Sequence, residues 1–180
     1  MGHPVRRKAG KLLDAPRGMR AQRFDHCLLY GPNIAEAEKY FTEVLGMFAP
    51  EVCNTPEGNR FATWLTSGNK AHDIAFVEYE KPGKIHHLAF LLQDWNDIGN
   101  AADFIGRYSL KRDVGPTRHA ITRGQTIYFW EPSGNRIETY CGGYTAYPDN
   151  PVRVWDVSEV GKGLFYYEGE LIPSFLQVVT

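Results

Sequence analysis

The chain has 180 residues, of which 43% are apolar, 13% aromatic and 23% charged, a composition typical of a soluble globular protein. Its net charge of −1, with both signs well mixed, argues against a nucleic-acid or membrane-surface partner and favours a small neutral or weakly charged ligand. The three cysteines lack CxxC spacing, which argues against a disulfide framework and a thiolate zinc cluster. The sequence has no long apolar segment, which argues against a membrane span. Together these features predict a cytoplasmic location.

Residues 1–22 hold six Lys or Arg and one acidic residue, which predicts a basic arm or linker. The globular part is expected to begin at Arg23. Apolar and β-branched runs separated by Gly, Pro and Asn then predict a strand at 24–30, a helix at 34–46 with Asn33 as its cap, and strands near 47–53, 60–67 and 72–79.

The same order of elements recurs in the second half of the chain. The pattern predicts a strand at 85–92, a helix at 94–108, and strands near 109–114, 125–131 and 136–141. His26 and His87, 61 residues apart, occupy matching places in the first strand of each copy. This internal repeat predicts an α+β fold of two β-α-β-β-β modules, whose half-open, barrel-like sheet surrounds a shared cavity.

The predicted domain organisation is a catalytic domain at 23–141, made of modules at about 23–80 and 83–141, followed by a tail at 142–180 that packs on it. Within this tail we expect a short helix in the region 157–166. The apolar run 171–179 needs a packing partner, and no catalytic residue is assigned to the tail.

The repeated histidines indicate a metal site inside the cavity. His26 and His87 lie in equivalent strands and can face one ion, whereas strict alternation would place Asp25 and His86 on the opposite face. Glu138 is the best third ligand, and two imidazoles with one carboxylate are the ligand set of non-haem iron(II) oxygen chemistry. From the spacing alone, Glu138 could equally pair with Arg136 on a solvated face.

The stretch Thr117–Glu138 resembles the signature of the extradiol ring-cleaving dioxygenases, which belong to the vicinal oxygen chelate superfamily. Together with Arg23-Phe24-Asp25-His26, the His72 region, His86-His87 and Cys141-Gly142-Gly143, it resembles the catechol 2,3-dioxygenase branch in residue type and in order. The resemblance covers essentially 23–180 and implies the glyoxalase/bleomycin-resistance/dioxygenase fold.

The resemblance implies that His26, His87 and Glu138 hold Fe(II), with Mn(II) as the alternative metal, and that catechol or a substituted catechol reacts with dioxygen to give 2-hydroxymuconic semialdehyde. It also implies three residues around the substrate. His72 would lie beside the oxygen-binding position, His119 would hydrogen-bond a substrate oxygen, and Tyr128 would hydrogen-bond the ligated phenolate oxygen.

Two other functional classes stay open at this stage: a glyoxalase-like or epimerase-like metalloenzyme using Zn, Ni or Co, and a metal-free small-molecule binding module. His72, His119 and Tyr128 argue against the first class, and retention of all three candidate ligands argues against the second. The resemblance also implies a homotetramer of four-module chains. Because this chain begins at what resembles an inter-domain linker, we expect intact iron ligation with reduced stability or activity.

Overall fold

The computed structural model describes residues 18–177, so most of the predicted arm 1–22 and the last residues of the apolar tail lie outside the described residues. The first module consists of β1 (Arg23–Gly31), α1 (Ile34–Glu43), β2 (Phe48–Asn54), β3 (Arg60–Thr66) and β4 (Ile74–Glu78). The second consists of β5 (Lys84–Leu91), α2 (Trp95–Arg107), β6 (Lys111–Arg118), β7 (Gly124–Trp130) and β8 (Arg136–Gly142). The predicted α+β class and the repeated order of elements are confirmed.

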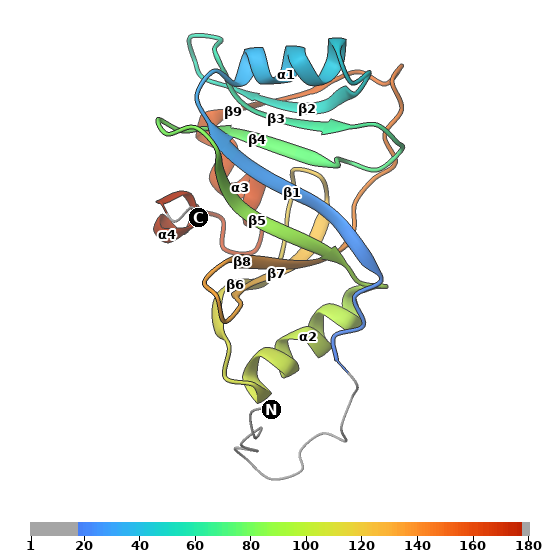
Figure 1. Cartoon of the computed structure of the whole chain (residues 1–180), viewed down its shortest axis with the longest axis vertical. Coiled ribbons are helices and arrows are strands. Elements are labelled where there is room, and N and C mark those ends of the chain that lie inside the picture. Colours follow the sequence, from blue (N-terminus) through green and yellow to red (C-terminus); the bar gives the residue numbers. More distant parts are fainter. Residues whose placement is uncertain (1–17, 178–180) are drawn as a thin grey trace.

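The strands within residues 18–177 join one sheet in the order β6-β7-β8-β5-β1-β4-β3-β2-β9. The first strands of the two modules, β1 and β5, lie side by side and antiparallel at its centre, so the modules are related by an approximate twofold axis. Helix α1 packs on β2–β4 and helix α2 on β6–β8, at opposite ends of the elongated molecule (Figure 1). Within residues 18–177, no helix has the length and apolar character needed to cross a bilayer.

The tail contributes more structure than the sequence patterns predict. Strand β9 (Arg153–Asp156) pairs in parallel with β2 and forms an edge of the sheet that was not predicted. The expected short helix appears as the 3₁₀ turn η1 (Val157–Glu159) followed by α3 (Val160–Leu164), and α4 (Pro173–Gln177) follows within the apolar run. The apolar run finds its packing partners through Phe175, which is 2% exposed and lies against Phe165 and Tyr128.

Two local predictions are wrong in detail. Asn33 stands at the start of α1, but it has a left-handed backbone (φ 62°) and its side chain makes no capping hydrogen bond. Strand β6 is longer than the predicted 109–114 and runs through Gly115 and Pro116. It can do so because β6 is an edge strand paired only with β7, where a proline need not remove a ladder hydrogen bond.

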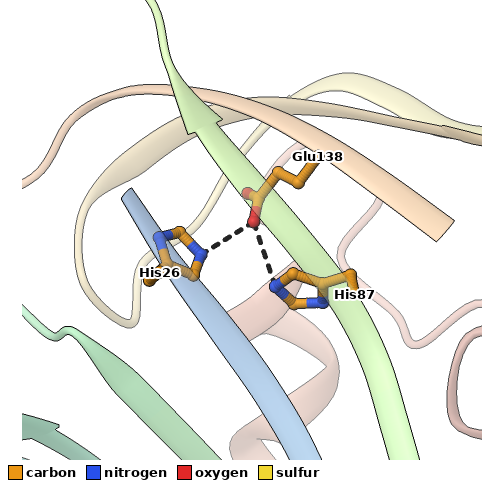
Figure 2. Close-up of side chains that lie close together, drawn as sticks. All are labelled: His26, His87 and Glu138. Carbon is orange, nitrogen blue, oxygen red and sulfur yellow. Dashed lines mark hydrogen bonds and ion pairs between the residues drawn. The ribbon is translucent and has the colours of Figure 1, made fainter. Parts of the chain in front are cut away.

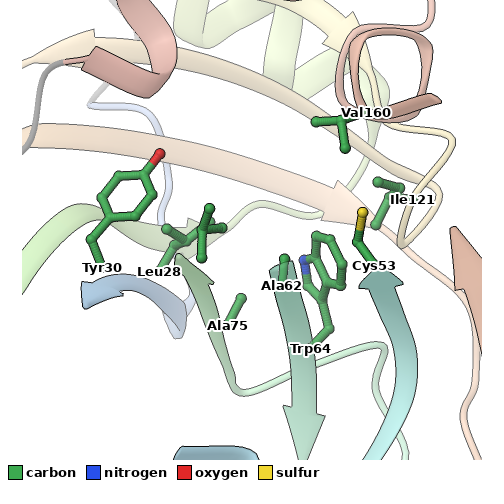
Figure 3. Packing of buried hydrophobic residues seen from close by; sticks show 9 residues of the cluster. Leu28, Tyr30, Cys53, Ala62, Trp64, Ala75, Ile121 and Val160 are labelled. Carbon is green, nitrogen blue, oxygen red and sulfur yellow. The ribbon is translucent and has the colours of Figure 1, made fainter. Parts of the chain in front are cut away.

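The largest buried cluster joins the two modules and the tail. Residues of the first-module strands, among them Leu28, Ala62 and Trp64, form most of it (Figure 3). They pack against Ile121 from the β6–β7 loop and Val160 from α3. A second cluster, which includes Ile98, Ile105 and Ile127, packs α2 on its own strands. Because Ile121 follows shortly after His119, the shared cluster anchors the loop that carries this candidate catalytic histidine.

The regular alternation of side chains between the two faces of the sheet fails at two equivalent places, one in β1 and one in β5. Between β1 and β5, Asp25 is an extra residue between the paired Phe24 and His26, and His86 is an extra residue between the paired Ile85 and His87. Such β-bulges turn two successive side chains toward the same side of the strand. The prediction that Asp25 and His86 face away from the neighbouring histidines is therefore wrong. Asp25 and His86 are themselves 61 residues apart, so the repeat includes the bulge.

The two modules differ at the position of the candidate carboxylate ligand. In the first module Leu28 pairs with Ala75, and in the second Ala89, which lies 61 residues after Leu28, pairs with Glu138. Ala75 is therefore the counterpart of Glu138 across the approximate twofold axis. Both residues are fully buried, but only the second module supplies a carboxylate.

Candidate metal centre

Three side chains from three adjacent strands converge on one point on the inner side of the sheet. His26 comes from β1, His87 from β5 and Glu138 from β8, and one potential ligand atom of each lies within 4.8 Å of the others. Glu138 Oε2 lies 2.8 Å from His26 Nε2 and 3.1 Å from His87 Nε2 (Figure 2). The group has the residue types and strand positions predicted from the sequence.

These distances fit a bound transition-metal ion. Ligand atoms held at about 2.1 Å from a metal, at right angles to one another, are about 3 Å apart. The two distances from Glu138 Oε2 to the imidazole nitrogens fall at that separation. Two imidazoles and a carboxylate on one face leave further coordination positions for other ligands.

Burial makes the electrostatics of the group strong. His26, His87 and Glu138 are 2%, 3% and 0% exposed. Although burial alone would raise the pKa of Glu138, the neighbouring histidines hold it well below its usual value. For His26, burial is outweighed by the Glu138 and Asp25 carboxylates, which raise the pKa, whereas burial lowers the pKa of His87 to about 4.

The alternative pairing of Glu138 with Arg136 does not describe the structure. The Arg136 side chain is buried and its Nε lies 3.0 Å from Asp113 Oδ2, with the guanidinium over the Trp130 ring. Glu138 instead accepts hydrogen bonds from His26 and from the Thr126 hydroxyl, at 2.8 and 2.5 Å. Glu138 is thus part of a buried polar cluster and not of a solvated face.

Each of the three converging side chains has a second polar partner. Asp25 Oδ2 lies 2.9 Å from His26 Nδ1, and His86 Nδ1 lies 2.7 Å from His87 Nδ1. Partners of this kind fix the tautomer and ring orientation of metal-ligating histidines. Asp25, His86 and Thr126 were not assigned this role from the sequence, because the two bulges that position Asp25 and His86 carry no clear signal in residue type.

The three residues predicted to surround the substrate lie on two sides of the cluster. The His72 ring packs against the His26 ring with centroids 4.1 Å apart and the ring planes tilted by 49°, and among the described residues its Nδ1 has no hydrogen-bond partner. Burial lowers the pKa of His72 well below its usual value, which keeps the imidazole neutral. On the other side, the Tyr128 and His87 ring centroids are 5.2 Å apart.

His119 and Tyr128 form a hydrogen-bonded pair. His119 Nδ1 donates to the backbone carbonyl of Leu164 in α3, and its Nε2 lies 2.9 Å from the Tyr128 hydroxyl oxygen. His119 Nε2 also lies 3.6 Å from Glu138 Oε1. Burial, reinforced by the charge of Glu138, raises the pKa of Tyr128 well above its usual value, so the phenol is kept protonated.

A small, partly open cavity adjoins these groups. It has a volume of about 20 Å³, which suits a water molecule and is too small for an aromatic ring. Its polar lining comes largely from the histidines described above and from Tyr128 and Tyr140, and its apolar lining includes Trp64, Leu164 and Phe175. The tail segment therefore closes one side of the cavity, a contribution that its sequence alone did not reveal.

Comparison with known proteins identifies the family of the chain. Residues 23–139 match the Glyoxalase/Bleomycin resistance protein/Dioxygenase superfamily. The chain is 46% identical to the metapyrocatechase of Pseudomonas sp. (strain CF600) over 91% of its own length and 53% of that protein. It is 29% identical to the manganese-dependent 2,3-dihydroxybiphenyl 1,2-dioxygenase of Geobacillus genomosp. 3, over 87% of its length and 51% of that protein.

Solved structures show the same relationship. The 2,3-dioxygenase LapB from Pseudomonas sp. KL28 is 50% identical and superposes with a TM-score of 0.77 over 78% of this chain and 49% of that one. Homoprotocatechuate 2,3-dioxygenase from Brevibacterium fuscum, in complex with 3,4-dihydroxyphenylacetate, gives a TM-score of 0.82 at 28% identity, covering 90% of this chain and 51% of that one. The chain thus spans about half the length of these relatives, and it belongs to the Glyoxalase/Bleomycin resistance protein/Dioxygenase superfamily.

Proposed function

We propose that the chain carries the active site of an extradiol catechol dioxygenase, in which His26, His87 and Glu138 hold one Fe(II). The observation that carries the proposal is the convergence of these three buried side chains at metal-ligand spacing, with His72 on one side and the His119–Tyr128 pair on the other. The metal, when bound, would bring a catechol and dioxygen together as neighbouring ligands and pass electrons from the ring to oxygen.

The surrounding residues have separate tasks in this proposal. The Tyr128 hydroxyl and His119 Nε2 are linked by a hydrogen bond and can move a proton between them as a catechol oxygen ionises. His72 has an open Nδ1 on the opposite side, where it can donate to or accept from the oxygen reactant. A glyoxalase-like or epimerase-like enzyme would not need these three groups in addition to the metal ligands.

The lining of the cavity supports a neutral substrate. Among the residues that line it, within the described part of the chain, none is a lysine or an arginine, so a carboxylate on the substrate would meet no permanent positive charge. We therefore propose catechol or an alkylcatechol as the substrate. A carboxylate-bearing ring, such as the ligand in the Brevibacterium fuscum structure, should react less well. Binding of any ring requires the apolar lid residues Leu164 and Phe175 to move apart.

The proposal is tested by loading the protein anaerobically with Fe(II), and separately with Mn(II), and then adding catechol in air. We expect a yellow ring-cleavage product with at least one of the two metals, and a slower reaction with 3,4-dihydroxyphenylacetate. Glu138→Gln should abolish both metal binding and turnover, and Glu43→Gln, an exposed glutamate at the end of α1, serves as the matched control. Bound metal without ring cleavage would refute the dioxygenase assignment.

A further inference from the structure

His86 occupies the place in the second module that Asp25 occupies in the first. Both are bulge residues, and each precedes a candidate ligand and contacts its Nδ1, at 2.9 Å for Asp25–His26 and 2.7 Å for His86–His87. A carboxylate is a common partner of a metal-bound histidine, whereas a second imidazole is an unusual one. His86 is also fully buried, so water cannot replace it as the partner of His87.

The contacts of His86 continue beyond His87 to the tail. His86 Nε2 lies 2.6 Å from the backbone carbonyl oxygen of Phe175 in α4, and the two rings pack with centroids 4.4 Å apart. Arg136 Nη1 contacts the same His86 Nε2 and donates to the same carbonyl at 3.3 Å. A continuous buried chain of contacts therefore runs from Glu138 through His87 and His86 to α4.

Two proton arrangements are available to this chain, and each leaves one contact of His86 Nε2 unfavourable: with the Phe175 carbonyl oxygen when Nε2 is unprotonated, and with Arg136 Nη1 when Nε2 carries the proton. Without an ion, Arg136 can donate to His86 Nε2, and His86 Nδ1–H can donate to His87 Nδ1. The Nε2–H of His87 is then free to point at Glu138. With an ion on His87 Nε2, the protons must lie the other way, because that nitrogen has to offer its lone pair. His87 Nδ1–H then donates to His86 Nδ1, and His86 Nε2–H donates to the Phe175 carbonyl.

We propose that His86 is a positioning residue for the metal ligand His87. Its Nδ1 accepts the proton of His87 Nδ1 in the loaded site, and its Nε2–H is held by the carbonyl of Phe175. This proposal rests on the metal site proposed above. It makes metal retention depend on the tail, because the segment that closes the cavity also selects the His86 tautomer that lets His87 bind the ion.

Two substitutions separate the two halves of this role. The Asn amide oxygen in His86→Asn can take the position of Nδ1 and still accept from His87. The Gln amide group in His86→Gln reaches the position of Nε2 and can still donate to Phe175, but it leaves His87 Nδ1 without an acceptor. We expect His86→Gln to weaken Fe(II) binding by about 10- to 100-fold, the usual loss for such a partner. His86→Asn should retain most of the affinity.

Affinity is measured anaerobically by competition with a chromogenic chelator, and the melting temperature of each metal-free variant is recorded alongside. Ile105→Val, a buried residue of the α2 cluster, is the control for loss of stability without a change at the site. The proposal is supported if His86→Gln binds Fe(II) much more weakly, while His86→Asn binds it with near-normal affinity and the two variants have similar melting temperatures. Equal losses in both, or losses that follow melting temperature as in Ile105→Val, would overturn it.

A measurement on the unsubstituted chain keeps the test independent of how the variants fold. In protein labelled with ¹⁵N-histidine and loaded with Zn(II) as a diamagnetic probe, we expect His86 to carry its proton on Nε2 and His87 on Nδ1. A loaded protein with the His86 proton on Nδ1 would refute the role of His86 alone. Failure of the unsubstituted chain to bind Fe(II) or Zn(II) would refute the metal site as well.

Discussion

The hydroxyl of Thr126 donates to Glu138 Oε1 at 2.5 Å, on the carboxylate oxygen that does not face His26 and His87. Thr126 is fully buried, so Thr126→Val keeps the shape of the side chain but leaves this oxygen without its donor. Losing a hydrogen bond to a buried charge costs about 1.5 to 3 kcal/mol. We expect the free energy of unfolding of the metal-free protein, measured in urea, to fall by that amount. Thr126→Ser, which keeps the hydroxyl, should lose less, and equal losses in both would contradict the assignment.

Metal binding should release about one proton near pH 6.5. Of the three candidate ligands, Glu138 is already ionised because its pKa is lowered, and His87 is already neutral because its pKa is about 4. His26 has a raised pKa, so it still carries a proton at its ordinary pKa of 6.5 and must lose it to bind metal.

The sign of the pH dependence follows from His26 alone. Affinity should increase by about tenfold per pH unit as the pH rises from 6 toward the raised pKa of His26, and level off above it. Calorimetric titration with Mn(II) in buffers of different ionisation enthalpy counts the protons released. A release of no protons, or an affinity that does not change with pH in this range, would contradict the prediction.

Tyr128→Phe removes the hydroxyl that is hydrogen-bonded to His119 Nε2 and leaves the ring packing with Phe175. If this hydroxyl assists proton transfer, kcat with catechol should fall by about 10²- to 10⁴-fold. Iron content and Fe(II) affinity should stay unchanged, because Tyr128 is not one of the converging ligands. A large loss of iron in this variant would show that Tyr128 supports the site structurally.

Gly124→Ala tests the packing behind His26. A Cβ at Gly124 would lie 2.0 Å from Tyr140 Cε2, and the Tyr140 ring packs edge-on against His26 with centroids 5.1 Å apart. Overpacking of this kind costs about 1 to 3 kcal/mol, and we expect weaker metal binding as Tyr140 shifts. Gly99→Ala in α2 meets open space and should stabilise the protein by up to about 1 kcal/mol, with no effect on metal. Thermal melting and chelator competition distinguish the two variants.

Much of the fold could be predicted from the sequence because its elements follow regular periods. The apolar residues Ile98, Ala101 and Ile105 of α2 recur at helical spacing and are buried as that spacing requires, and Asp94 caps the helix through the amides of Asn96 and Asp97. The repeat placed His26 and His87 in equivalent strands, and they lie close together because β1 and β5 are neighbours at the centre of the sheet.

What could not be predicted depends on departures from regular structure and on long-range packing. Asp25 and His86 reach their neighbours only through bulges, which a period of two residues does not reveal. The roles of Leu164 and Phe175 arise from backbone carbonyls, which have no residue-type signal, and from a tail whose path is set by packing on the finished sheet. Strand β9 is short and half-exposed, so its composition does not distinguish it from a loop.

The first module has Ala75 at the position where the second has Glu138, and this difference has a consequence for reactivity. Were the two halves of the sheet identical, a carboxylate at Ala75 would approach the same ion from the opposite side of the twofold axis and complete a symmetric four-ligand cage. Such a cage would bind the metal tightly and leave it little room to exchange partners. The Ala75 methyl group in place of an acid breaks the symmetry between the two modules, so a metal held by His26, His87 and Glu138 would receive no fourth ligand from β4.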